Sequence, residues 1–151
     1  MNPKRGYKMI EQLITSFIAT AGFGLLFNVP KETVLRCGLS GMLGWIFYFY
    51  LVEMGVDSVA ASGTASILIG VIGQLFARRY KTPIIIFNVT GIIPLVPGGL
   101  AYDAMRHFVV NDYSVALPLA AKAFLISGAI AVGLVLSEMI NQIIARIRPA
   151  K

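Results

Sequence analysis

The residues best suited to hold a ligand lie in one short stretch, Asn88 to Tyr102, which reads NVTGIIPLVPGGLAY. This stretch belongs to an uncharged run over positions 82–102, long enough to cross a bilayer as a helix. A spanning helix favours residues such as leucine, yet Pro94 and Pro97 occur here, followed at once by two glycines. Each proline lacks an amide hydrogen and clashes with the carbonyl group one turn earlier. The chain therefore interrupts its own helix at membrane depth.

The interruption leaves backbone polar groups without helical partners. We expect one half-helix to end near Ile93 and a second to begin near Gly99, with the glycines permitting backbone angles that other residues avoid. In hydrocarbon such a break is tolerated only where protein or a water-filled cavity satisfies the freed groups. Transport proteins use this arrangement, because half-helix ends present dipoles and free backbone groups to a substrate at the midplane. The alternative is a kink that only improves packing.

The predicted substrate-contacting residues are the polar and turn-forming members of this stretch, together with the tyrosine one turn after the break. They are Asn88, Thr90, Gly91, Pro94, Pro97, Gly98, Gly99 and Tyr102.

Four ionisable residues within or beside the apolar segments are further candidates, because charges at membrane depth are costly. Glu138 is the deepest carboxylate, and Asp103 directly follows the broken segment. We expect one of these two to couple transport to protons by changing its protonation state during the cycle. Lys122 and Arg36 lie close to helix ends, where they either anchor the chain at the interface or attract an anionic substrate.

The composition requires lipid around these residues. Of the 151 residues, 57% are hydrophobic and only 13% are charged, whereas an ordinary soluble domain is about one-quarter charged. The sequence therefore predicts an all-α integral membrane protein with a single membrane domain over residues 1–151. The segments long enough to span are 11–29, 34–54, 59–77, 83–102 and 119–144. The longest connection, 103–118, is expected between the last two.

Small residues recur at helical spacing in three of these segments. In lipid they let helix backbones approach closely, which supplies dispersion energy for association. We expect helix packing at these faces, with a cavity lining as the alternative. The residues are Ser62, Ser66 and Gly70; Ala129, Gly133 and Ser137; and Gly38, Gly41 and Gly44.

The distribution of Lys and Arg favours an outside N-terminus and an inside C-terminus, because cytoplasmic loops carry more of these residues. With five spans, eight fall inside: Lys31, Arg36, Arg78, Arg79, Lys81, Arg146, Arg148 and Lys151. Five fall outside: Lys4, Arg5, Lys8, Arg106 and Lys122. A re-entrant fourth segment would change this assignment.

Several function classes find no support in the residues. The net charge of +6 comes from short clusters between apolar runs, as loop anchors do, and not from a stripe that would bind nucleic acid. His107 is the only histidine and Cys37 the only cysteine, so histidine-rich metal sites and a Ser–His–Asp triad are poorly supplied. We expect no cofactor, no metal and no enzymatic activity.

The stretch NVTGIIPLVPGGLAYDAM, preceded by RRYKTP and followed by a glycine-containing last segment, resembles the threonine/serine exporter family. More narrowly, it resembles the short C-terminal membrane half of that family, which many bacteria make as a separate small subunit. The likeness covers positions 13 to 140. The IPLVPG core with a tyrosine soon after it carries most of the likeness, and the other segments agree in spacing and composition.

The resemblance implies a fold, a substrate class and a partner. Family members export small polar metabolites, such as threonine, serine or dicarboxylates, from the bacterial cytoplasm with the proton-motive force. The short form works with a separately encoded larger membrane subunit in the plasma membrane. In fused members the half that corresponds to this chain begins outside and ends inside. Motif positions carry over to Pro94, Pro97, Gly98, Gly99 and Tyr102. Two alternatives remain, a stabilising subunit that transports nothing and a self-sufficient homo-oligomer.

Overall fold

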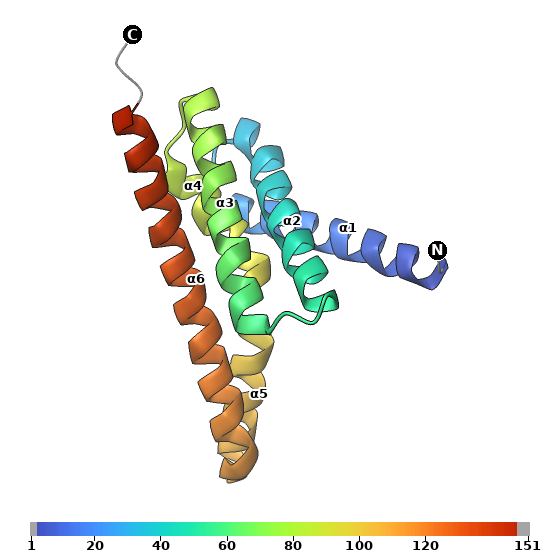
Figure 1. Ribbon diagram of the computed structural model, residues 1–151. Helices are drawn as coiled ribbons and strands as arrows, with labels where there is room; N and C mark the ends of the chain where they lie inside the picture. Colours follow the sequence, from blue (N-terminus) through green and yellow to red (C-terminus); the bar gives the residue numbers. More distant parts are fainter. Residues whose placement is uncertain (1–2, 148–151) are drawn as a thin grey trace.

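The computed structural model describes the backbone of residues 3–147 and the side chains of residues 9–144. Within this range the chain is helical throughout and contains no strand, which confirms the predicted all-α membrane fold. Figure 1 shows the arrangement of the helices. In chain order they are α1 (Pro3–Leu26), α2 (Lys31–Glu53), α3 (Ser58–Tyr80), α4 (Ile84–Gly91), the 3-10 turn η1 (Ile93–Leu95), α5 (Gly98–Val109) and α6 (Tyr113–Ile147).

Four helices are long and apolar enough to cross a membrane, and a bent pair makes a fifth candidate span. The pair joins Ile84–Leu95 to Gly98–Val109 with a bend of 54°. In Figure 1, α4 lies near the end of the bundle where α3 finishes, and α5 lies at the opposite end, beside the first half of α6. The bent pair therefore passes from one end of the bundle to the other, as a broken span does.

The last two spans are longer than the sequence predicts. α5 continues to Val109 and α6 begins at Tyr113, so the connection expected over 103–118 is a turn of three residues. Asn111 makes this turn possible with a left-handed φ of 60°, a conformation that asparagine tolerates. Pro118 lies inside α6. Its ring does not end the helix, and the carbonyl group that loses its helical partner belongs to the exposed Ser114 in the first turn of α6.

The small-residue faces of α3 and α6 pack against each other, as predicted. A Cβ atom at Gly70 would overlap the Ser137 side chain, and one at Gly133 would overlap both Ser66 and the backbone carbonyl of Gly63. The two backbones therefore approach more closely than any larger side chain would allow. In the absence of a hydrophobic drive in lipid, this contact stabilises the bundle through dispersion.

The glycines of α2 do not pack against a single helix: two of them contact α1 and one contacts α3. Gly38 and Gly41 lie against Phe17 and Thr20 of α1, whereas Gly44 lies against Ile69 of α3. α2 is thus wedged between α1 and α3.

α1 crosses α2 at a steep angle, so that its N-terminal half projects away from the bundle (Figure 1). Near the crossing, the Trp45 indole N–H donates to Gln12 Oε1 at 2.7 Å. On the projecting half, Met9, Ile10 and Ile14 are about half exposed. The outer surface of α1 is thus apolar and unpartnered within the described chain.

The central core joins the broken span to α3 and α6. It consists of Ala65, Ile69, Leu95, Ile126 and Ile130, each no more than 5% exposed. Leu95 belongs to η1, so the turn itself is anchored in the core. The break therefore has a fixed place in the bundle.

Candidate functional site

The break follows the order that the prolines and glycines predict. α4 ends at Gly91, η1 covers Ile93–Leu95, and α5 begins at Gly98. Val96 is extended, with φ −61° and ψ 128°, and turns the chain out of the first half-helix. Its N–H donates to the Ile93 carbonyl at 3.3 Å, which satisfies one of the groups freed by the break.

The α4 side of the break is closed. Thr90 is 1% exposed and donates to the Ile86 carbonyl at 2.7 Å. A Cβ atom at Gly91 would lie 2.7 Å from Ile69 Cγ2 and 3.1 Å from Ser40 Oγ, so only glycine fits there. The first half-helix is thus held by α2 and α3 without room for a ligand beside Gly91.

The α5 side of the break is open. Gly98 and Gly99 are exposed, and a Cβ atom at either position would meet nothing within 4 Å. Neither glycine has a positive φ, so the expected conformational reason for them is wrong. Their effect is to leave the first two positions of α5 without side chains, where the Gly98 N–H donates to the Val96 carbonyl at 2.8 Å and the next N–H groups have no partners within the helix.

Tyr102 and Asp103 lie apart from the polar residues of α4. Tyr102 is 69% exposed and lines a shallow groove of about 290 Å³ on α5 together with Met105 and Val109. Asp103 is also exposed. The structure therefore does not bring these two residues to Asn88 and Thr90.

Asn88 instead faces α3. A Cβ atom at Gly73 would overlap Asn88 Oδ1, so the glycine makes room for this side chain. Asn88 Oδ1 is buried and has no hydrogen-bond partner among the described residues. It is one of two buried amide oxygens in this part of the bundle that lack a donor.

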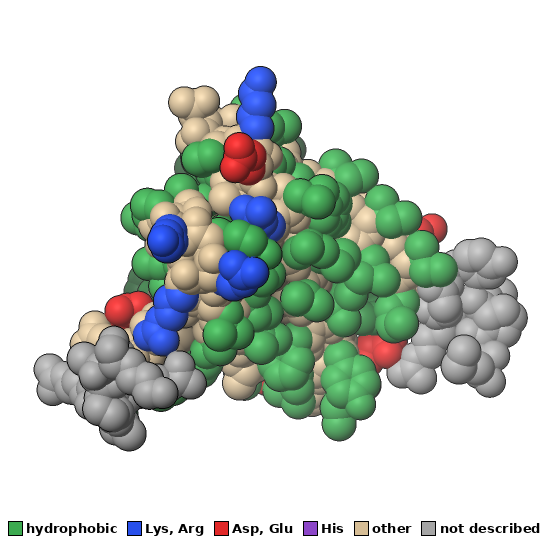
Figure 2. Space-filling model, turned by 90° about the horizontal axis from the view of Figure 1, so that it is seen from above, with side chains coloured by type: hydrophobic (Ala, Val, Ile, Leu, Met, Phe, Trp, Pro, Cys, Tyr) green, Lys and Arg blue, Asp and Glu red, His purple; other side chains and the backbone are tan. Residues whose placement is uncertain are grey.

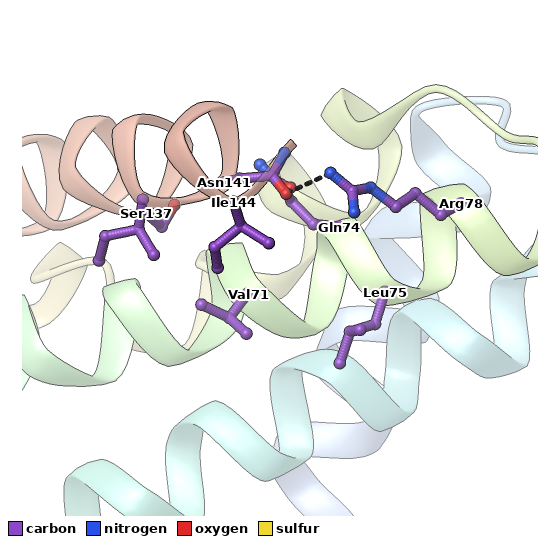
Figure 3. Close-up of a pocket in the computed structure, with 8 residues that line it drawn as sticks. Val71, Gln74, Leu75, Arg78, Ser137, Asn141 and Ile144 are labelled. Carbon is purple, nitrogen blue, oxygen red and sulfur yellow. Dashed lines mark hydrogen bonds between the residues drawn. The ribbon is translucent and has the colours of Figure 1, made fainter. Parts of the chain in front are cut away.

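The second buried amide oxygen without a donor is Gln74 Oε1, in a polar cluster between α3 and α6. Gln74 Nε2 donates to Glu138 Oε2 at 2.7 Å, and Gln142 Nε2 donates to Glu138 Oε1 at 3.3 Å. One turn further along, Arg78 Nη2 donates to Asn141 Oδ1 at 2.5 Å. Figure 3 shows Gln74, Arg78 and Asn141 at a pocket of about 210 Å³.

A second cavity, of about 150 Å³, lies on the α4 side of this cluster. Gln74, Arg78 and Asn141 line it as well, and it adds Glu138 and the α4 residue Ile84. The sequence identified Glu138 as an ionisable candidate but gave no signal for its pairing with a residue 64 positions earlier. Sequence reasoning therefore missed Gln74 as the hydrogen-bond partner of Glu138.

The two cationic candidates, Arg36 and Lys122, lie away from the break. The Arg36 guanidinium carbon lies 3.5 Å from the centre of the Tyr80 ring, in a cation–π contact that joins α2 to α3. Lys122 is exposed on α6. Neither faces the break.

Basic residues gather at one end of the bundle. Figure 2 looks onto this end and shows Lys and Arg side chains spread over it. In the described part of the chain, the ends of α2 and α3 supply Lys31, Arg36, Arg78, Arg79 and Lys81.

The opposite end is capped by a small hydrogen-bonded turn. Ser114 Oγ donates to Asp112 Oδ1 at 2.8 Å, and His107 Nδ1 lies 3.1 Å from Asp112 Oδ2. The Ser114 hydroxyl, and then His107, hold the pKa of Asp112 below its ordinary range. His107 therefore fastens the end of α5 to the start of α6. Among the described residues, no three His, Cys, Asp or Glu side chains gather as a metal site would require.

Comparison with known proteins assigns the family. The family model described as "Threonine/Serine exporter, ThrE" matches residues 12–140, a range that includes the whole broken span. The chain belongs to the threonine/serine exporter family. An uncharacterized protein of Haemophilus influenzae is 32% identical over 111 residues, which cover 70% of this chain and 37% of that relative. No solved structure matches the chain.

Family membership and the apolar helices together make this a multi-pass membrane protein of an exporter family. The range that matches the family model includes the IPLVPG stretch, which lies between α4 and α5. The candidate site of this chain therefore has two features, the open start of α5 and the polar cluster around Glu138.

Proposed function

We propose that this chain is one subunit of a bacterial secondary exporter that carries small polar metabolites, either threonine and serine or dicarboxylates such as succinate. It works with a larger membrane subunit of the same family and performs no covalent chemistry. The observation that carries the proposal is the unequal packing of the break: α4 is buried, while Gly98 and Gly99 at the start of α5 meet nothing.

The bare start of α5 supports a shared site. The first N–H groups of a helix have no intrahelical partners and carry the positive end of the helix dipole. Of these groups, the Gly98 N–H already donates to the Val96 carbonyl at 2.8 Å, so the N–H groups of Gly99 and Leu100 are the ones that need a partner at membrane depth, because hydrocarbon offers none. A substrate held between this chain and the larger subunit supplies that partner, with Pro94 and Pro97 setting the break and Asn88 and Thr90 behind it.

Two exposed apolar surfaces support a place for the larger subunit. One is the α5 face with Tyr102, Met105 and Val109, which are 69%, 66% and 75% exposed. The other is the projecting half of α1. The α5 face adjoins the glycines, so a subunit docked there would complete the surroundings of the break.

We place the chain in the bacterial inner membrane with its N-terminus outside and the basic end in the cytoplasm. The end formed by the start of α2 and the end of α3 carries five Lys and Arg residues. The turns that face the other way, between α2 and α3 and between α5 and α6, carry Arg106 and the carboxylates of Glu53, Asp57 and Asp112. This asymmetry supports the orientation, since cytoplasmic ends are enriched in Lys and Arg.

Glu138 is the proposed proton-coupling residue. It is half-buried within the bundle and bonded by two amides, whereas the rival candidate Asp103 is exposed on α5. In this scheme Lys122 and Arg36 anchor the chain at the interfaces, because one is exposed and the other stacks on Tyr80.

The test uses Pro97→Leu and Gly98→Leu, co-expressed with a larger subunit in cells that lack related exporters. Cells are loaded with threonine through a dipeptide, or with labelled succinate, and efflux is followed. We expect both variants to insert and to co-purify with the larger subunit but to lose export. Gly22→Leu is the matched control, because Gly22 of α1 is exposed, also has nothing within 4 Å, and lies on a helix that contributes no residue to the central core around the break.

Normal export by well-expressed Pro97→Leu and Gly98→Leu would refute the proposal. Loss of the complex itself in these variants would indicate the stabilising subunit instead. Efflux by this chain alone would indicate a homo-oligomer, in which copies of opposite orientation complete the path.

A further inference from the structure

Gln74 holds an unusual position for an amide side chain. It is 5% exposed, and its Nε2 donates to Glu138 Oε2 at 2.7 Å. A charged carboxylate only accepts hydrogen bonds, so this contact fixes which end of the amide faces Glu138. The other end, Oε1, points away and is buried with no donor among the described residues. A buried acceptor without a donor carries a desolvation penalty that any new donor would relieve.

Protonation of Glu138 changes what this contact can be. A neutral carboxyl group has one O–H, which donates. With the proton on Oε2, the carboxyl O–H and the Gln74 N–H would face each other as two donors. Half a turn of the amide about its last side-chain bond removes this conflict. Gln74 Oε1 then accepts from Glu138, and Nε2 takes the buried position that Oε1 had held.

The alternative position for the proton is Glu138 Oε1, which faces Gln142 at 3.3 Å. Gln142 is exposed, so water already satisfies its amide and a turn there gains little. Gln74 is buried, and its turn gives the unpaired oxygen a donor while it leaves the Nε2 hydrogens in the buried position, where a substrate acceptor would pair with them. The difference in burial therefore directs the response to Gln74.

The remaining surroundings of Glu138 contain one charge. Arg78 of α3 lines the same 150 Å³ cavity and is bonded to Asn141. α4 has no charged residue between Ile84 and Gly91. On α6, the described neighbours Ser137, Asn141 and Gln142 are neutral.

We propose that Gln74 is a positioning residue that converts the protonation of Glu138 into a reversal of hydrogen-bond polarity inside the bundle. This rests on the proposed function, in which Glu138 carries the coupling proton. When Glu138 is charged, the buried end of Gln74 is an acceptor and suits an ammonium or hydroxyl group. When Glu138 is protonated, the same position is a donor and suits a carboxylate. A small substrate with both kinds of group is then held differently in the two halves of the cycle.

The direct test observes the amide itself. The chain has three glutamines, Gln12, Gln74 and Gln142, so selective labelling of glutamine side chains with ¹³C and ¹⁵N gives three assignable signals. NMR spectra of the full chain in lipid bilayers are recorded across a pH series. We expect the Gln74 amide to change with the same midpoint as the Glu138 carboxyl group, and Glu138→Gln to abolish that change while preserving side-chain size. A Gln74 signal that stays constant while Glu138 is titrated would overturn the inference.

Export measurements then distinguish a positioning role of Gln74 from a purely structural one. Gln74→Met keeps the length of the side chain and removes the amide, and Gln142→Met is its control on the other oxygen of Glu138. We expect Gln74→Met to lower export driven by a pH gradient on the order of tenfold, as loss of one buried hydrogen bond predicts, with substrate exchange at equal pH retained. Equal losses in Gln74→Met and Gln142→Met would contradict it. The NMR result does not depend on export, so failure of the proposed function and failure of the amide reversal are distinguishable.

Discussion

The two halves of the broken span differ in what holds them. α4 has eight residues, of which Phe87, Thr90 and Gly91 are buried against neighbouring helices. α5 has twelve residues, of which only Ala104 is buried. The Phe87 ring also packs edge-on against Phe76 with centroids 5.6 Å apart, whereas Tyr102 of α5 is 69% exposed.

This difference indicates a division of labour within one span. α4 is fixed by its own chain, so its substitutions act on folding. α5 keeps an exposed face and an uncovered start, so its substitutions act on whatever covers it. Paired substitutions, one on the α4 side of the break and one on the α5 side, test this difference through the free energy of unfolding.

The largest expected effect is that of Phe87→Ala compared with Tyr102→Ala. Removing a fully buried phenylalanine leaves a cavity, and we expect a loss of about 3–5 kcal/mol in the free energy of unfolding. Tyr102→Ala should change it by roughly 0.5 kcal/mol or less, as an exposed site does. Unfolding of the purified chain in mixed micelles, titrated with a denaturing detergent, checks both values. Similar losses for the two variants would show that α5 is also fixed by this chain.

A smaller effect is expected for Gly73→Ala compared with Gly98→Ala. The new methyl group at Gly73 overlaps Asn88 Oδ1, so α4 must shift from α3 at a cost of roughly 1–3 kcal/mol. The methyl group at Gly98 meets nothing, so the isolated chain should keep its stability. The same detergent titration compares the two. A destabilised Gly98→Ala would mean that the start of α5 is packed after all.

The smallest effect concerns the turn after α5. The Ser114 hydroxyl and His107 hold the pKa of Asp112 below its ordinary value of 3.8. Because the folded pKa is the lower one, the carboxylate stabilises the turn fully at pH values well above 3.8, and this contribution is lost as the pH falls through the folded value. We expect faster amide exchange in the turn only under acid conditions. Asp112→Asn should show fast exchange at every pH, and an unchanged pH profile in that variant would contradict the assignment.

The sequence located the break because proline and glycine act locally on the backbone. It also identified the small-residue faces of α3 and α6, since their spacing follows the helical period. It could not show that α5 would leave Tyr102 outside, because the direction of a side chain depends on the 54° bend between the two half-helices. Nor could it pair Gln74 with Glu138, 64 residues apart, because no periodic pattern connects two helices. Pro118 lies inside α6 and not in the connection expected over 103–118, because its ring removes only one helical hydrogen bond, at the exposed Ser114.

The contact between α1 and α2 gives the protein an intrinsic optical probe. Trp45 is the only tryptophan in the chain, and its indole N–H is bonded to Gln12 on α1. Its fluorescence therefore responds to the separation of α1 from α2 without any attached dye, and Gln12→Leu, which removes the bond to α1 but not the contact with Tyr48, gives the reference spectrum. With a larger subunit whose own tryptophans have been replaced, a shift in emission on mixing would time the moment at which the projecting helix changes its neighbour.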